Sequence, residues 1–346
     1  MLILGIESSC DETAASVVQD GRRVLSNIVA SQAALHEEYA GVVPEIASRA
    51  HVERILPVVR EALAQAGAGL GMIDAVAVGH RPGLIGSLLV GVTAAKALAW
   101  SLGKPLIGVD HVHAHLYSGV LRGQEDLGDV PFPALGLVVS GGHTSLYRLE
   151  SWTRLVRLGA TIDDALGEAF DKAATLLGLP YPGGPNLDRL AELDGADDRM
   201  TELPISRIAP GSLDFSFSGL KTAMLYAVRG VPGPKGRAAP PLTEARRRDL
   251  AASFRRAAVR AVMLKLERAA EVHSYRGVCT GGGVTANALL RRELSAFGAS
   301  RAVPVFLPRL EFCMDNAAMI AGLGCELIRE RGASDLSLRA DPSSIV

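Results

Sequence analysis

The chain has 346 residues, of which 48% are hydrophobic, and its 36 Lys and Arg residues balance 37 Asp and Glu residues. This length predicts two lobes, each with enough apolar residues for a core. The near-zero net charge excludes a globally basic nucleic-acid-binding protein, so any such contact must use a local patch or another protein.

Nothing in the chain indicates secretion or membrane insertion. The N-terminal segment has no basic residues before Glu7, unlike a signal peptide. No window reaches the ~18 uninterrupted apolar residues of a transmembrane helix. The four cysteines have no C-x-x-C or framework spacing: Cys10, Cys279, Cys313 and Cys325. We therefore expect a reduced, cytoplasmic protein without a membrane partner.

The first third of the chain alternates predicted strands and helices. The apolar strands are residues 2–7, 14–18, a third strand after the Asp20-Gly21 turn signal, 73–78 and 105–109. The helical segments are residues 31–41, 44–66 and 84–102. A polar turn at residues 8–13 separates the first two strands.

Three of the eight histidines lie in the segment 109–115. Asp110 occupies the position of a helix N-cap, so His111 and His115 would share one face of a short helix while His113 points elsewhere. Such a pair often supplies a metal with two imidazole ligands. By spacing alone, two unligated histidines near a helix start are an equally good interpretation.

The opening pattern returns after a charged linker at residues 125–133. Residues 134–139 and 145–149 read as strands around a polar turn at residues 140–144. The repeat predicts two related lobes, although chance similarity between short strands is the alternative. Predicted helices then alternate with strands at residues 277–280 and 302–306; the helices are 165–177, 187–191, 244–273, one from about 286, and 315–330. This alternation predicts an α/β fold.

Two glycine turns could let the backbone approach a ligand: Ser140-Gly141-Gly142 and Gly281-Gly282-Gly283. Without Cβ atoms, successive N–H groups can converge on a phosphate. Neither turn fits the dinucleotide or P-loop pattern. If the repeat is real, the turns at 8–13 and 140–144 face each other, as the phosphate-holding turns of two-lobed actin-type and sugar-kinase-type ATPases do.

Four acidic residues fall in one predicted helical stretch: Asp163, Asp164, Glu168 and Asp171. The spacing places the last three on one face. Such a face is usually solvated, but beside Gly167 it could instead approach a ribose or an amine.

Eight motifs follow one another along nearly the whole chain: GIESSCDET at 5–13, GVVPEIASR at 41–49, HVHAH at 111–115, VSGGHT at 139–144, DDALGEAFDK at 163–172, YPGGP at 181–185, FSFSGLKT at 215–222 and GGGVTAN at 281–287. Together they resemble the TsaD family of bacterial tRNA N6-adenosine threonylcarbamoyltransferases. An ordered set of eight is far more specific than any one motif.

The resemblance implies a two-lobed actin-like ATPase fold, which is a ribonuclease H-like duplication. The N-terminal lobe would comprise residues 1–130 and the C-terminal lobe residues 131–321, with a C-terminal helix at about 322–346 packing back on the first lobe. The implied reaction transfers a threonylcarbamoyl group from threonylcarbamoyl-adenylate to N6 of adenosine 37 in tRNAs that read codons beginning with A, and releases AMP. The implied partners are tRNA, a TsaB-like paralogue and a TsaE-like ATPase.

The resemblance also assigns site residues. His111, His115 and Asp315 would bind one divalent metal, with iron(II) favoured over zinc. Contacts to an adenylate or ATP-type ligand map onto Val138, Val139, Ser140, Gly141, Gly142, Asp171, Gly184, Asp188 and Asn287. Asp11 matches an acidic residue of the family's catalytic cleft.

The chain departs from the family pattern at two places. His80-Arg81-Pro82-Gly83 replaces the usual Gly-Pro-Gly turn, which bears on a lobe surface or on the tRNA path. Met314 replaces the usual Thr before the metal aspartate and removes a hydroxyl near the metal.

Basic residues gather beside a Pro- and Gly-rich loop at residues 230–241: Arg229, Lys235, Arg237, Arg246, Arg247 and Arg248. A tRNA contact and a solvated surface explain this cluster equally well. Two other functions are alternatives for the whole chain. A non-transferring actin-fold ATP-binding regulatory or scaffold protein has no use for the proposed metal ligands, and a metalloprotease would need a Glu after His111.

Overall fold

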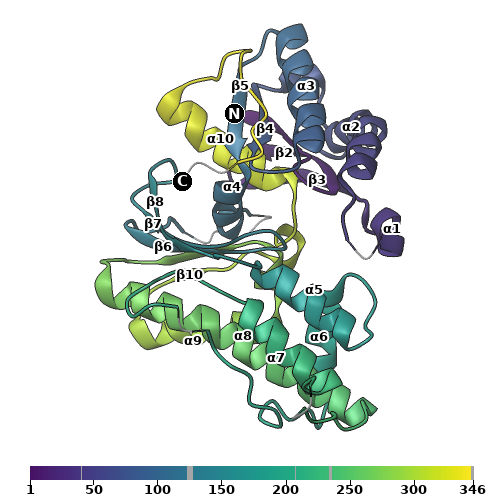
Figure 1. Cartoon of the computed structure of the whole chain (residues 1–346). Coiled ribbons are helices and arrows are strands. Elements are labelled where there is room, and N and C mark those ends of the chain that lie inside the picture. The colour runs from purple at the N-terminus through teal and green to yellow at the C-terminus, as the bar shows by residue number, and fades with distance from the viewer. Residues whose placement is uncertain (40, 123–127, 207, 234–235, 344–346) are drawn as a thin grey trace.

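The structure is a computed structural model, and it describes residues 1–346 except 40, 123–127, 207, 234–235 and 344–346. Two five-stranded sheets form the centres of two lobes (Figure 1). The first sheet has the order β3-β2-β1-β4-β5 and the second β10-β9-β6-β7-β8. The strands are β1 Leu2–Glu7, β2 Glu12–Gln19, β3 Arg23–Ser31, β4 Ala75–Arg81, β5 Leu106–Asp110, β6 Ala134–Val139, β7 Thr144–Leu149, β8 Leu155–Ala160, β9 Val278–Gly281 and β10 Val305–Phe306.

The two sheets share one topology. In the first sheet Ile6 of β1 pairs antiparallel with Ala15 and parallel with Val78. In the second sheet Leu137 of β6 pairs antiparallel with Leu146 and parallel with Thr280. The third strand lies outside the second, and the fifth outside the fourth, in both sheets. The predicted duplication and α/β class are therefore confirmed.

The helices are α1 Ala33–His36, α2 Pro44–Gln65, α3 Ile85–Leu102, α4 His111–Tyr117, α5 Leu166–Leu176, α6 Gly183–Ala191, α7 Ser218–Arg229, α8 Glu244–Val272, α9 Ala288–Arg301 and α10 Ala317–Arg331. Short 3₁₀ turns occupy Glu37–Tyr39, Leu70–Met72, Ser118–Val120, Gly283–Ala286 and Leu310–Phe312. The predicted helix over residues 31–41 is therefore only α1 and one 3₁₀ turn.

Strand β8 is absent from the prediction: it is short, and Arg157 and Gly159 interrupt its apolar residues. Its residues are mostly partly buried or exposed, so the burial pattern shows no clear alternation. The predicted linker at residues 125–133 falls partly outside the described residues. The boundary between lobes near residue 130 stays a prediction.

The terminal helix of each half packs against the sheet of the other half (Figure 1). Helices α2 and α3 pack on the first sheet, where α10 contacts β1, β2, β4 and β5 as well. Helix α4, which follows β5, contacts β6 and β9 of the second sheet in addition to β4 and β5 of its own sheet. Gly5 permits the close packing of α10, because a Cβ there would lie 2.3 Å from the carbonyl oxygen of Ala317. Helices α4 and α10 therefore meet at the seam between the lobes.

Among the described residues, α3 alone has the length and apolar composition to cross a membrane. It packs against β4 and α2. A core helix of a globular protein has the same composition, so this feature is weak support for a membrane span.

Candidate metal and ligand site

Helix α4 begins where β5 ends, and Asp110 caps it. The Asp110 carboxylate accepts hydrogen bonds from the backbone N–H of Val112 at 3.0 Å and of His113 at 3.2 Å. This confirms the predicted N-cap. His111 and His115 are buried on one face of the helix, whereas the His113 ring packs edge-on against the ring of Tyr147.

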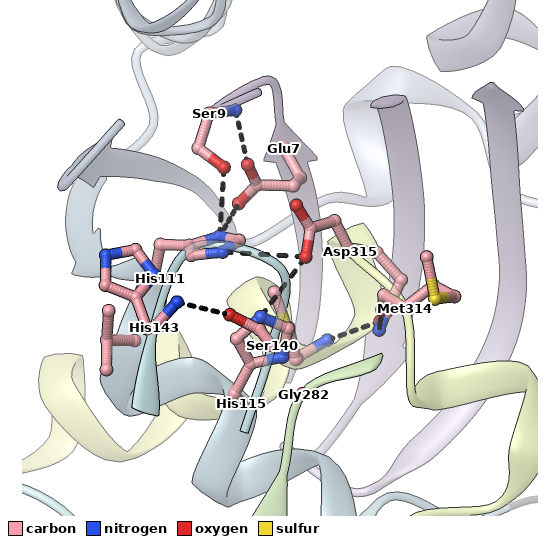
Figure 2. Close-up of polar contacts among 12 residues, drawn as sticks. Glu7, Ser9, His111, His115, Ser140, His143, Gly282, Met314 and Asp315 are labelled. Atoms are coloured by element: carbon pink, nitrogen blue, oxygen red, sulfur yellow. Dashed lines mark hydrogen bonds and ion pairs between the residues drawn. The ribbon is translucent and has the colours of Figure 1, made fainter. Parts of the chain in front are cut away.

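The two buried histidines meet Asp315, which lies just before α10 (Figure 2). Asp315 Oδ1 is 3.1 Å from His115 Nε2 and 3.6 Å from His111 Nε2. One possible ligand atom from each residue lies within 4.8 Å of the other two. The three residues that the resemblance assigned to a metal are thus brought together, although Asp315 is 200 positions away from His115.

Glu7 and Ser9 hold the far side of the His111 ring (Figure 2). His111 Nδ1 is 3.1 Å from Glu7 Oε2 and 3.1 Å from Ser9 Oγ. The other Glu7 oxygen accepts the backbone N–H of Ser9 at 2.5 Å. Glu7 is fully buried, so its carboxylate is committed to these partners. This arrangement turns Nε2 of His111 toward Asp315.

The three side chains strongly perturb one another's protonation. Burial lowers the pKa of His115. Burial also opposes the charge of His111, but Glu7 and Asp315 outweigh it and raise the pKa of His111 to about 9. Burial would raise the pKa of Asp315, yet the neighbouring imidazoles hold it well below its usual range.

The chemistry of this cluster fits a cation. Both ring nitrogens of His115 are buried without a hydrogen bond among the described residues, since the 3.1 Å approach to Asp315 lacks hydrogen-bond geometry. A buried polar atom without a partner is costly, and a metal ion would satisfy it. Two imidazole nitrogens and one carboxylate are a common ligand set for divalent iron and zinc.

The Ser140–His143 turn lies beside the metal cluster. Ser140 N–H donates to the carbonyl of His143 at 2.7 Å, and Ser140 Oγ accepts the N–H of His143 at 3.1 Å. A Cβ on Gly141 or Gly142 would meet nothing within 4 Å, so both face open space. Burial and the charges of His111 and His115 lower the pKa of His143 to about 4. The turn therefore presents two accessible glycines and a neutral imidazole.

The second glycine turn has a structural explanation. A Cβ on Gly281 would lie 1.9 Å from the carbonyl oxygen of His115, so only glycine lets β9 pass α4. Gly282 has a φ of +95°, and a Cβ there would lie 2.4 Å from the carbonyl oxygen of Val139. The second turn therefore needs glycine for close backbone packing, whereas the glycines of the first turn face open space.

The remaining predicted ligand residues form two hydrogen-bonded pairs. Asp171 Oδ1 accepts the N–H of Gly184 at 2.8 Å. Asp188 Oδ1 accepts from Asn287 Nδ2 at 2.7 Å and from Arg255 at 2.9 Å. The first pair spans 13 residues of sequence and the second 99.

Val138 and Val139 are fully buried in β6. Their side chains point into the core, and any contact with a ligand would use the backbone. Gly141 and Gly142 are therefore the more accessible part of this segment.

Asp163 and Asp164 precede α5, so the prediction that they fall in one helical stretch with Glu168 and Asp171 is wrong, and Asp164 does not share a helix face with those two. Asp163 accepts the N–H of Phe217 at 2.8 Å and the Ser218 hydroxyl at 2.7 Å, and so caps α7. Asp164 lies between Lys172 at 2.7 Å and Lys221 at 3.0 Å. The helix begins only at Leu166 because these two carboxylates are used in tertiary contacts.

Asp11 lies in the polar turn after β1 and is largely buried. Burial raises the pKa of the adjacent Glu12 well above its usual range, and Asp315 and Asp11 add to this effect. Burial, Asp11 and Asp171 likewise raise the pKa of Tyr181, which belongs to the other lobe. Acidic side chains of both lobes, Asp11 and Asp171, therefore act on the Tyr181 phenol.

Sequence reasoning missed four residues of this region: Glu7, Ser9, His143 and Tyr181. Glu7 could have been noticed, because a carboxylate ending an otherwise apolar strand must find a partner. The others lie in motifs whose individual contacts depend on the tertiary structure.

Comparison with known proteins places this geometry in a family. A sequence model described as TsaD: tRNA N6-adenosine threonylcarbamoyltransferase matches residues 23–322. The chain belongs to this family. A relative from Symbiobacterium thermophilum named tRNA N6-adenosine threonylcarbamoyltransferase is 52% identical over 341 residues, covering 99% of this chain and 96% of the relative. A relative of the same name from Moorella thermoacetica is 50% identical over 343 residues, with coverage of 98% and 96%.

Solved structures share the fold at much lower identity. HypF from T. kodakarensis has a TM-score of 0.58 at 17% identity, covering 94% of this chain and 48% of that protein. The Acidaminococcus fermentans (R)-2-hydroxyglutaryl-CoA dehydratase component A has a TM-score of 0.51 at 13% identity, covering 95% and 100%. The two-lobed actin-like fold predicted for the TsaD-family chain is confirmed.

Proposed function

We propose that this chain transfers the threonylcarbamoyl group of threonylcarbamoyl-adenylate to N6 of adenosine 37, in tRNAs that read codons beginning with A. The observation that carries the proposal is the His111–His115–Asp315 cluster at the lobe seam, with both histidines buried and Asp315 partly buried, in a chain of the TsaD family. An ATP-binding scaffold would have no need of such a cluster.

The cluster would hold one divalent metal. We favour iron(II) over zinc, because two imidazole nitrogens and one carboxylate oxygen with open coordination positions are the ligand set of non-haem iron(II) sites. When bound, the metal would act as a Lewis acid toward an oxygen of the adenylate ligand. Glu7 keeps His111 in the orientation that presents Nε2. Met314 is half exposed beside Asp315 and supplies no hydroxyl there, in contrast to the Thr that is usual in the family.

The Ser140–Gly142 turn would bind the phosphate or carbamoyl region through backbone N–H groups. Its open glycines permit this approach. Val138 and Val139 would support the turn from within the sheet. Asp171 with Gly184, and Asp188 with Asn287, would frame the adenosine part of the ligand.

In the transfer step the N6 amine attacks the carbamoyl carbon, the carbon–oxygen bond to the phosphate breaks, and AMP leaves with the bonding electrons. The amine is a weak nucleophile, so alignment of the two substrates and stabilisation of the developing oxyanion should dominate the rate enhancement. Asp11 is the residue to which we assign acceptance of the proton that N6 loses.

A TsaB-like paralogue and a TsaE-like ATPase would complete the system, in the cytoplasm. Exposed apolar side chains on α2 and α3 support a protein partner there: Val52, Leu56, Ile85, Leu89 and Trp100. Trp100 is 75% exposed, which is unusual for so large an apolar side chain on a free surface.

The tRNA would contact the C-terminal lobe near the end of α7. Arg229, Arg237 and the 40% exposed Tyr226 line a shallow cavity of about 290 Å³. Arginines can bind phosphates and a tyrosine can stack on a base. Arg246 instead donates to the carbonyls of Pro240 and Ala227, and Arg247 pairs with Glu244, so these two support the loop. Lys235 lies outside the described residues.

Reconstitution tests the proposal. The purified chain, tRNA, threonylcarbamoyl-adenylate and the two partner proteins are combined, and the nucleosides of digested tRNA are analysed by mass spectrometry. We expect threonylcarbamoyl-modified adenosine with the wild-type chain and none with His111→Ala. Nucleotide binding without modified adenosine would favour the scaffold function instead.

A further inference from the structure

We propose that His51 of α2 is a positioning residue that fixes the backbone on both sides of Asp11, together with Gln32. The inference deepens the proposed function, because it concerns how the residue assigned to accept the N6 proton is held. His51 is fully buried and touches neither the metal cluster nor the glycine turn through a hydrogen bond among the described residues.

The two ring nitrogens of His51 contact the turn after β1 and the start of β2. Nε2 lies 3.0 Å from the carbonyl oxygen of Cys10, and Nδ1 lies 2.8 Å from the hydroxyl of Thr13. A carbonyl can only accept, so Nε2 must carry the proton and Nδ1 must accept from Thr13. Burial lowers the pKa of His51, which agrees with a neutral ring in this single tautomer.

Gln32 holds the next peptide group. Its backbone N–H donates to the carbonyl of Asp11 at 3.1 Å. Its side-chain amide lies 3.4 Å from the carbonyl of Ala47 in α2 and 3.5 Å from His51 Nδ1. Gln32 is fully buried as well. It therefore joins the turn to the same helix as His51 does.

These contacts fix the two peptide planes that flank the Cα of Asp11. The Cys10 carbonyl belongs to the peptide group before Asp11 and is bonded by His51. The Asp11 carbonyl belongs to the peptide group after it and is bonded by Gln32. With both planes held, φ and ψ of Asp11 are set, and so is the direction in which its Cβ leaves the backbone. Loss of the hydrogen bond from His51 would let the peptide plane before Asp11 rotate. The Asp11 carboxylate would then no longer be held in one position.

A purely structural histidine is the alternative, and two matched substitutions separate the roles. In His51→Gln the side-chain amide can reach the region of Nε2 and still donate to Cys10. In His51→Asn the shorter amide lies near Nδ1, so it can meet Thr13 but not Cys10. Both variants remove the ring and leave a similar packing defect. Thr13→Val removes only the other hydrogen bond and serves as a further control.

The kinetic test compares these variants in the reconstituted reaction. A misplaced catalytic group lowers turnover on the order of tenfold to hundredfold. We expect that loss in kcat for His51→Asn, an unchanged KM for both substrates, and recovery of most of the turnover in His51→Gln. Equal losses in the two variants, in step with their thermal stability, would overturn the inference.

A second readout does not depend on transfer. Cys10 is partly accessible in the turn, whereas Cys279, Cys313 and Cys325 are buried. We expect Cys10 to be alkylated faster in His51→Asn than in His51→Gln or the wild type, as followed by peptide mass spectrometry. Equal alkylation rates would contradict the positioning role even if the chain transferred nothing. Absence of transfer by the wild type, with the alkylation difference present, would reject the proposed function alone.

Discussion

Glu7 Oε2 lies 3.1 Å from His111 Nδ1, in a space that exists because residue 79 is glycine. A Cβ at Gly79 would lie 2.5 Å from the same carboxylate oxygen. One carboxylate–imidazole contact thus joins the end of β1 to the start of α4, and β4 packs closely against it. Such contacts orient the histidine ligands of metals and raise their basicity.

Substitution of Glu7 by Ala should weaken metal binding by roughly 10- to 100-fold. The variant loses the partner that orients His111, while the three ligands remain. Competition with a coloured chelator measures the affinity, and elemental analysis gives the stoichiometry. His115→Ala, which removes a ligand, should lose the metal altogether.

Gly79→Ala should act in the same direction as Glu7→Ala, because its methyl group displaces the carboxylate. Gly71→Ala is the matched control, since a Cβ there meets nothing within 4 Å. Metal affinity unchanged in both Glu7→Ala and Gly79→Ala would show that Glu7 does not support the site.

The two glycine turns should respond to substitution in opposite ways. Gly141→Val should block ligand approach and leave the unfolding free energy nearly unchanged, because the site is open and its φ is not positive. Gly281→Ala should destabilise the fold by about 1–3 kcal/mol, since the methyl group meets the carbonyl of His115. Nucleotide titration and urea unfolding measure the two effects. A folded Gly141→Val protein with wild-type nucleotide affinity would exclude this turn from the ligand site.

Asp163→Ala should lower the free energy of unfolding by about 1 kcal/mol through loss of the α7 cap. Burial opposes ionisation of Asp163, but hydrogen bonds from Ser216, Phe217 and Ser218 prevail and lower its pKa. A lowered folded-state pKa stabilises the fold above the unfolded value near 4, and this contribution disappears as the pH falls through the folded pKa. The difference between wild type and variant should therefore be full at pH 7 and shrink below pH 4. A difference that does not depend on pH would contradict the capping role.

The sequence predicted contacts between residues close together in the chain better than contacts between residues far apart. The pairing of His111 with His115 follows from helical spacing, and Asp110 as a cap follows from its place after an apolar strand. Asp315 was reached only through the family resemblance, because no local pattern links it to α4. Asp163 was placed on the wrong element, since its partners lie more than 50 residues away in α7. The contacts of Glu7 and His51 were not foreseen, because a buried polar group reveals its partner only in the folded chain.

Arg229→Gln combined with Arg237→Gln should reduce the salt dependence of tRNA binding. Each phosphate contact removed should lower the slope of log affinity against log salt by about one. Arg246→Ala is a poor probe, because Arg246 supports the loop through two backbone carbonyls. Affinity should be measured with the partner proteins present. An unchanged slope would move the tRNA path to another surface.

Transfer to N6 of adenosine 37 is tested most directly by AMP release in a single turnover, with tRNA as the variable. The chain, loaded with metal and combined with its partners, receives threonylcarbamoyl-adenylate and either a tRNA with adenosine at position 37 or the same tRNA with guanosine there. We predict AMP release equal to the modified adenosine formed with the first tRNA, and only background release with the second. Equal AMP release with both tRNAs would contradict transfer to N6 of adenosine 37.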